Sequence, residues 1–365
     1  MSLRADREAT VGETGREELA SRVAERARAV EAECGPAKAE AFYAVASGEA
    51  TPLALPMATY LGESGIKDRS QDEVRRSVRT LVEWCERGSV AATVEAIDRK
   101  VACRFVSGEL LKGRERATAA KYLSFLSGYW RWLVARGIAE TNPWGGQIPK
   151  RGARAKLGES ATGKRPYTDD EAVKLLSGPA SERLRGIIWI AALSGMRIDE
   201  ICRLRVGDCR GGWFAVNAAP GEGKTKAATR RVPIHSALAS RVAALAGERG
   251  AADYLIADLP DTGPGRERSM PAVKEYTRYR RAVGIDERAE GQRQSNVDFH
   301  SWRRWFARTS RDAGTSPWVV ADLLGHDTES MALGMTMGTY SGKASAADLR
   351  GGVEAVLVPA GAGEA

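Results

Sequence analysis

The stretch Leu184–Glu200, LRGIIWIAALSGMRIDE, sets the centre of the expected fold. Its first ten residues are almost continuously apolar, which predicts a helix buried on all sides. Gly195 follows at the position where helices commonly end, and Arg197 and Glu200 then lie about one helical turn apart. A guanidinium is always charged and presents a planar fork of donors that suits phosphate oxygens. The stretch therefore predicts a buried helix followed directly by an anion-binding arginine.

Three further segments, far from this stretch in the chain, supply groups suited to the same chemistry. Lys224 and Lys226 lie in a Gly- and Lys-rich turn between strands expected at 213–216 and 230–234. His300 and Arg303 form a His-x-x-Arg sequence, in which they lie one helical turn apart. A helix expected to start at Ser316-Pro317 ends at a Leu-Gly-His sequence. The candidate catalytic residues are Arg197, Lys224, His300, Arg303, His326 and Tyr340, with Glu200 in a supporting role.

Together these groups are what metal-free cleavage of a phosphodiester requires. The nucleophile would be the phenol of Tyr340, whose ordinary pKa of about 10 makes it unreactive until nearby cations ease the loss of its proton. Protonated Lys224 could donate to the departing oxygen, and Lys226 is an alternative for that role. Two arginines would stabilise charge on the equatorial oxygens. No spacing of His, Cys or acidic residues suits a metal, and no Gly-rich loop suits a nucleotide, so we expect no cofactor.

This set of segments resembles the tyrosine recombinases, also called phage-type integrases. The family pattern is Gly-x-Arg-x-x-Glu, a lysine in a hairpin, His-x-x-Arg, Leu-Gly-His and a late tyrosine, and the resemblance runs from about Thr59 to about Leu349. It implies that Arg197 and Arg303 grip the scissile phosphate and that His300 shares the tyrosine proton. It also implies that Tyr340 forms a 3′-phosphotyrosyl bond without metal or ATP. The 14 residues from His326 to Tyr340 exceed the usual gap in the family.

The charge of the chain favours a polyanionic partner. The 365 residues carry a net charge of +8. Residues 97–156 alone hold thirteen basic and four acidic residues, which is the pattern of a segment that binds backbone phosphates. We expect double-stranded DNA as the partner. The candidate DNA-binding residues are Lys112, Arg114, Arg116, Lys121, Arg131, Lys150, Arg151, Arg154, Lys226 and Arg230.

The expected fold class is a mainly helical N-terminal core-binding domain followed by a mixed α+β catalytic domain of the integrase type. Ser70 and Glu73 resemble a capping box that opens one helix, and a longer helix is expected over 117–136. The expected divisions are an acidic, partly helical and partly disordered extension (1–50), a helical DNA-binding domain (51–145), a basic linker (146–165), the catalytic domain (166–350) and a C-terminal tail (351–365).

The remaining features place the protein in the cytoplasm. Its five cysteines are an odd number and form no Cys-x-x-Cys pair, which suits a reducing compartment. No apolar run is long enough for a bilayer, and the N-terminus lacks an apolar signal core.

The resemblance also implies a homotetramer on two DNA sites. We expect the apolar tail residues Leu349, Val353, Val356 and Leu357 to pack on a neighbouring protomer. Two alternatives stay open: a type IB topoisomerase, which shares this chemistry but relaxes DNA as a monomer, and a DNA-binding protein that has lost cleavage.

Overall fold

The structure, a computed structural model, describes residues 13–148, 163–218, 228–260, 267–288, 290, 294–326 and 343–363. The chain divides into two compact units, Met1–Gly152 and Ala153–Ala365. The division falls inside the segment 146–165, whose role as a linker stays a prediction. None of the described helices combines the length and the apolar character needed to cross a bilayer.

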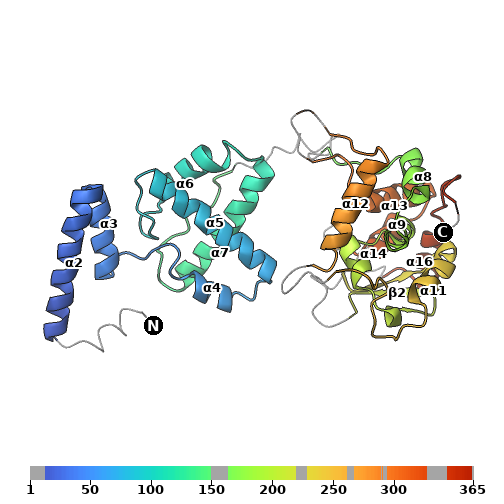
Figure 1. The fold of residues 1–365 in the computed structure, drawn as a ribbon, viewed down its shortest axis with the longest axis horizontal. Coiled ribbons are helices and arrows are strands. Elements are labelled where there is room, and N and C mark those ends of the chain that lie inside the picture. Colours follow the sequence, from blue (N-terminus) through green and yellow to red (C-terminus); the bar gives the residue numbers. More distant parts are fainter. Residues whose placement is uncertain are drawn as a thin grey trace. The chain divides into compact units, whose positions relative to one another are not determined.

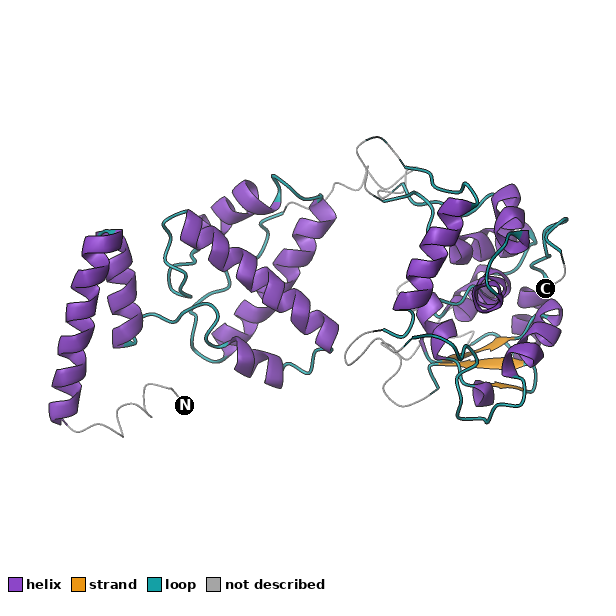
Figure 2. Cartoon of the chain, in the orientation of Figure 1, coloured by secondary structure: helices purple, strands orange, loops and turns teal. Residues whose placement is uncertain are grey.

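The named elements described in the N-terminal unit are helices, joined by loops that include an isolated β-bridge between Pro52 and Thr93 (Figures 1 and 2). Its helices are α2 (Glu13–Cys34), α3 (Pro36–Ser47), α4 (Met57–Glu63), α5 (Asp68–Arg87), α6 (Arg99–Phe105), the π-helical turn η1 (Val106–Leu110) and α7 (Arg116–Ala135). Helices α2 and α3 pack on each other, and α5 packs on α7. The core between α5 and α7 is formed by buried side chains that include Leu81, Leu126, Tyr129, Trp130 and Leu133.

Helix α7 confirms the predicted long helix, because its apolar residues recur at helical spacing and are buried together. It ends one residue before the predicted end, and Gly137 after it has a φ of 68°. The predicted capping box at Ser70 was wrong. Helix α5 begins at Asp68 with Lys67 as its N-cap, so Ser70 lies inside the first turn.

The C-terminal unit is mixed α+β, which confirms the predicted fold class (Figure 2). Its helices are α8 (Asp169–Ser177), α9 (Glu182–Ser194), α10 (Ile198–Arg203), η3 (Val206–Asp208), η5 (Ser236–Leu238), α11 (Ala239–Ala246), α12 (Met270–Ala282), α13 (His300–Asp312), α14 (Pro317–Leu324) and α16 (Ala346–Glu354). The strands β1 (Cys209–Arg210), β2 (Trp213–Val216) and β3 (Arg230–Pro233) form an antiparallel sheet in the order β1-β2-β3.

Helix α9 occupies the middle of this unit, as its apolar sequence predicts. Figure 1 views it end-on, with α8, α12 and α13 around it, and it contacts each of them as well as α10 and α11. Every residue from Gly186 to Ser194 is buried. Because other helices surround α9, their packing fixes the position of its C-terminal end and of Gly195 and Arg197, which follow it.

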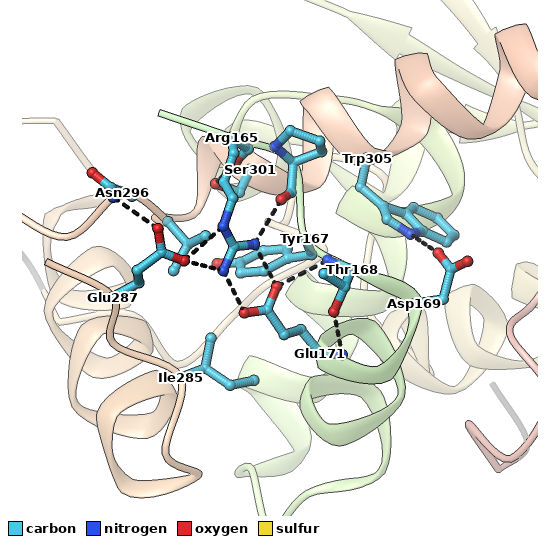
Figure 3. A network of polar contacts seen from close by, with 12 residues as sticks. Arg165, Tyr167, Thr168, Asp169, Glu171, Ile285, Glu287, Asn296, Ser301 and Trp305 are labelled. Carbon is cyan, nitrogen blue, oxygen red and sulfur yellow. Dashed lines mark hydrogen bonds and ion pairs between the residues drawn. The ribbon is translucent and has the colours of Figure 1, made fainter. Parts of the chain in front are cut away.

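The start of this unit is fastened to α13 by a network around Arg165 (Figure 3). The Arg165 guanidinium donates to both carboxylate oxygens of Glu171, at 2.7 and 2.8 Å, and to Glu287 on the other side. Its backbone carbonyl accepts a hydrogen bond of 2.8 Å from the Ser301 hydroxyl. Thr168 caps α8 through reciprocal hydrogen bonds with Glu171. The network fixes the N-terminal end of α13, where His300 lies.

The C-terminal segment packs on its own domain. Helix α16 contacts α14 and β3, and Val353 and Val356 are fully buried there. Glu354 accepts hydrogen bonds from the backbone and hydroxyl of Ser236. The expectation that these apolar side chains cover a neighbouring protomer was therefore wrong for Val353 and Val356, because the same chain buries them. Leu357 is 74% exposed.

Candidate active site

Gly195 allows the ends of three helices to meet. It ends α9 in the left-handed conformation with a φ of 63°, which a glycine adopts without steric cost. A Cβ at this position would lie 2.6 Å from a methyl group of Leu324 and 2.7 Å from the ring of Phe306. The C-terminal ends of α9 and α14 and the middle of α13 thus approach each other too closely for any side chain at Gly195. Arg197 follows as the N-cap of α10 and is placed at this junction.

Glu200 is a buried carboxylate between two arginines. It accepts 2.9 Å hydrogen bonds from the backbone N–H and from Nη1 of Arg197. Arg230 donates to both of its oxygens, at 3.2 and 3.0 Å. Burial alone would raise the pKa of Glu200, but the hydrogen bonds and charge of Arg230, with those of Arg197, hold it below its usual value. Glu200 is therefore ionised and fixes both guanidiniums.

Arg303 is the most deeply buried cation of the site. It is 3% exposed and donates to the backbone carbonyl of Gly195 at 3.0 Å and to that of Leu324. Burial, then the charges of Arg197 and Arg230, lower the pKa of Arg303 to about 9. The group is still a cation at neutral pH, and its environment carries excess positive charge that a bound anion would relieve.

Two arginines bind the C-terminal end of α14. Arg303 donates a hydrogen bond to the carbonyl of Leu324, and Arg230 Nε donates one to the carbonyl of Leu323 at 2.7 Å. The last carbonyls of a helix have no partner within the helix and carry partial negative charge, so cations stabilise them. Gly325, with a φ of 64°, then turns the chain, and the backbone N–H of His326 returns to Ala321 at 3.0 Å.

The two histidines of the predicted motifs lie in this positive environment. His300 is the first residue of α13, and partial burial followed by the charges of Arg304 and Arg303 lowers its pKa to about 4. Partial burial and the charges of Arg303 and Arg197 also lower the pKa of His326. His300 is therefore neutral near pH 7 and can accept a proton. The third histidine, His235, is buried elsewhere and accepts from the backbone of Ala237.

The structure thus gathers the described members of the predicted catalytic set. Arg197, Glu200, Arg303 and His326 meet where α9, α10, α13 and α14 end or cross, and His300 shares their electrostatic field. The remaining two predicted catalytic residues, Lys224 and Tyr340, lie outside the described residues. So does Lys226.

One predicted DNA-binding residue is placed differently from the expectation. The Arg230 side chain is only 6% exposed, and it is bound to Glu200 and to a backbone carbonyl. It therefore does not offer a free face to a DNA backbone. The alternation of strand β3 carried the signal, since Arg230 lies two residues before the fully buried Val232 and so on the same side of the strand.

The other candidate DNA-binding residues that are described belong to the N-terminal unit. Lys112, Arg116, Lys121 and Arg131 are exposed. Lys121 pairs with Glu73 at 2.9 Å, and Arg114 lies over the Tyr122 ring, 5.1 Å from its centroid. Lys150, Arg151 and Arg154 lie outside the described residues.

Known proteins resemble this chain in sequence. The family model of the phage integrase family matches residues 167–336. A tyrosine recombinase XerC of Xylella fastidiosa (strain M23) is 32% identical over 148 residues, which are 39% of this chain and 47% of the relative. The chain thus spans about half the length of these curated relatives.

Solved structures show the same fold. A lambda integrase tetramer bound to a Holliday junction is 22% identical with a TM-score of 0.55, over 76% of this chain and 77% of that one. The Tn1549 transposon integrase in complex with a circular intermediate DNA is 16% identical with a TM-score of 0.54, over 84% of this chain and 100% of that one. Residues 167–336 of the chain therefore match the phage integrase, or tyrosine recombinase, family, and the solved integrases have the same fold.

Proposed function

We propose that the protein is a site-specific DNA recombinase that cuts and rejoins double-stranded DNA through a covalent bond to Tyr340. The observation that carries the proposal is the convergence of Arg197 and Arg303 beside His326, with their guanidiniums held by Glu200 and by helix-end carbonyls. Such fixed cations suit an anion whose charge grows during the reaction, because they need no rearrangement when the transition state forms.

The reaction follows from the chemistry of these groups. The oxygen of Tyr340 attacks phosphorus while the bond from phosphorus to the 5′ oxygen breaks, which leaves a 3′-phosphotyrosyl bond. Arg197 and Arg303 stabilise the charge on the equatorial oxygens. Neutral His300 accepts the phenol proton, and Lys224 gives a proton to the 5′ oxygen. The phosphotyrosyl ester retains the bond energy, so a 5′ hydroxyl of another strand can reverse the step without ATP.

Lys226 is the alternative donor to the 5′ oxygen. Both lysines lie between β2 and β3, and the two strands pair from Trp213 with Pro233 to Val216 with Arg230. A protonated lysine at either position meets the chemical requirement. Comparison of Lys224→Ala with Lys226→Ala on DNA with a 5′-sulfur leaving group separates them, since a thiolate leaves without a proton. The variant whose cleavage is restored by sulfur identifies the acid.

The exposed basic side chains of the N-terminal unit provide a surface for the DNA backbone. Lys112, Arg116, Lys121 and Arg131 belong to the basic segment and contribute charge without a requirement for particular bases. The lambda integrase relative is described as a tetramer on a Holliday junction, which supports a homotetramer on two DNA sites for this chain. The described cysteines are all unpaired, in keeping with action in the reducing cytoplasm.

The test is covalent trapping on a nicked suicide duplex, in which the short strand diffuses away after cleavage. The wild-type chain should form a complex that survives denaturant and maps to Tyr340, and Tyr340→Phe should bind the duplex without forming it. If the wild-type chain only retains the duplex, the protein is a DNA-binding protein without cleavage. A recombinase should also join ends from two separate sites, whereas a topoisomerase should give relaxed circles only.

A further inference from the structure

Arg230 has the contacts of a structural hub. Its Nη1 and Nη2 atoms bind the two oxygens of Glu200, Nε binds the Leu323 carbonyl at 2.7 Å, and Nη1 also lies 3.3 Å from the carbonyl of Ala228. The side chain is 6% exposed and its carboxylate partner 4% exposed. A buried guanidinium with this many directed bonds has one well-defined position, because each bond constrains a different edge of the planar group.

These contacts join three parts of the site that are distant in sequence. Arg230 itself begins β3, the strand that follows the lysine-bearing turn. Glu200 belongs to α10 and also holds Arg197 through two hydrogen bonds. Leu323 lies near the end of α14, three residues before His326. A shift of Arg230 would therefore move the start of β3, Arg197 and His326 relative to each other.

We propose that Arg230 is a positioning residue for the cleavage step, which aligns Arg197 and His326 and does not itself contact DNA. The inference rests on the proposed recombinase function. It differs from the expectation that Arg230 belongs to the DNA-binding surface. Arg230 would affect the rate of DNA cleavage and have little effect on the affinity for DNA.

The electrostatics of the site agree with this placement. The charge of Arg230 helps to lower the pKa of both Arg303 and His326. The charged groups that act on His326 are Arg303 of α13, Arg197 before α10, and Arg230 of β3. Arg230 is therefore near enough to affect the protonation of the site while its donors are directed to protein groups.

A lysine cannot replace this arrangement. Its ammonium is a single point charge, so it could pair with Glu200 but could not also hold the Leu323 carbonyl in the same geometry. The substitution Arg230→Lys therefore keeps the charge and removes the alignment. The adjacent Arg231 offers a matched control, because it lies on the same strand, is exposed, and stacks 4.7 Å from the centroid of the Trp213 ring.

The experiment compares the full-length wild type, Arg230→Lys and Arg231→Lys on the nicked suicide duplex. The dissociation constant for the duplex and the single-turnover rate of covalent trapping are measured separately. We expect Arg230→Lys to trap about 10- to 100-fold more slowly, since small misplacements of reacting groups have effects of this order. Its dissociation constant should stay within about 2-fold of wild type, since Arg230 makes no phosphate contact. Arg231→Lys should match wild type in both.

A second measurement decides the placement of Arg230 without reference to cleavage. Titration of His326 by NMR should give a higher pKa in Arg230→Gln, because a nearby positive charge is removed, and a pKa that stays lowered in Arg230→Lys. If Arg230→Lys weakened duplex binding and left the trapping rate unchanged, Arg230 would be a DNA contact and the inference would be overturned. If the wild type trapped no DNA, the proposed function would fail, whereas the His326 titration would still test the position of Arg230.

Discussion

At the scale of single residues, Glu200 decides how the two neighbouring guanidiniums are held. Its side chain is 4% exposed and pairs with that of Arg230, which is 6% exposed, so the substitution Glu200→Gln would leave a buried cation without its counterion. Removal of one partner from a buried pair costs about 3–5 kcal/mol of stability. Urea denaturation of the purified chain should show a loss of this size.

The matched control is Glu182→Gln. Glu182 also lies between two arginines, Arg185 and Arg241, but its side chain is 80% exposed. Exposed ion pairs contribute about 0–1 kcal/mol, so this variant should unfold close to wild type. Equal losses in the two variants would contradict the buried-pair interpretation.

Glycine at position 195 is required by close contact as well as by backbone conformation. Gly195 and Gly211 have nearly the same φ, 63° and 61°, but only Gly195 of the two has side chains within reach of a Cβ. Alanine at either position should cost about 1–2 kcal/mol for the left-handed backbone. Gly195→Ala should cost about 1–3 kcal/mol more, because Leu324 and Phe306 must move. Thermal unfolding of the two variants measures the difference, and equal melting temperatures would disprove the steric argument.

His300 gives the chain a specific dependence on pH. Its pKa in the folded chain is lowered to about 4, from an ordinary value of 6.5. The unfolded chain therefore binds its proton first as pH falls, so this residue disfavours folding increasingly from about pH 6.5 down to about pH 4. His300→Gln removes this effect. Between pH 7 and pH 4.5 the wild type should lose more stability in urea than the variant, and equal losses would contradict the shifted pKa.

Arg197, Arg303 and His326 differ from Arg230 in how much of their surroundings the local sequence predicts. Arg197, Arg303 and His326 follow helix ends or repeat at helical spacing, so the motif that names them also predicts where they lie. Arg230 carries the same charge but its neighbours come from α10 and α14, more than twenty residues away in each direction. A run of basic residues does not reveal which of them has a buried partner. The alternation of β3 was the one local signal.

At the scale of elements, continuous apolar sequence and helix-end residues were sufficient to predict α9 and α14. The start of α5 was misplaced because several polar residues near Lys67 can cap a helix and local sequence does not rank them. The prediction that Val353 and Val356 pack on a neighbouring protomer was wrong for a different reason. An amphipathic segment requires a covering surface, but its sequence does not say whether the same chain supplies it.

The packing of α16 makes a prediction that neighbouring glycines can test. A Cβ on Gly352 would lie 2.8 Å from a methyl group of Val319 and 3.1 Å from that of Thr315, whereas a Cβ on Gly351 would meet nothing within 4 Å. Gly352→Val should therefore lower stability by about 1–3 kcal/mol through overpacking against α14. Gly351→Val places the same side chain in the same helix and should change it by less than about 1 kcal/mol. Differential unfolding in urea measures both, and similar values would show that α16 does not pack on α14 in solution.

At the scale of the whole molecule, the sequence predicts where basic residues are concentrated, but it does not predict which of them are exposed. The basic residues of segment 97–156 include Lys112 and Arg131, which are exposed on the N-terminal unit. The α2–α3 hairpin in the acidic stretch before it also exposes cations, such as Lys38. Net charge favours the first region over the second as the DNA-binding surface, because like charges repel the backbone.

The dependence of duplex binding on salt tests this assignment in the full-length chain. Each phosphate contact releases counterions, so removing one such contact lowers the steepness of log K against log salt concentration by about 0.9. The double substitution Lys112→Ala, Arg131→Ala should reduce the slope by about 2 and weaken binding to unrelated duplexes by similar factors. Lys38→Ala, which removes one exposed charge from α3, should leave the slope unchanged. A reduced slope in Lys38→Ala with an unchanged slope in the double variant would show that the DNA backbone binds the α2–α3 hairpin. The segment 97–156 would then not be the DNA-binding surface.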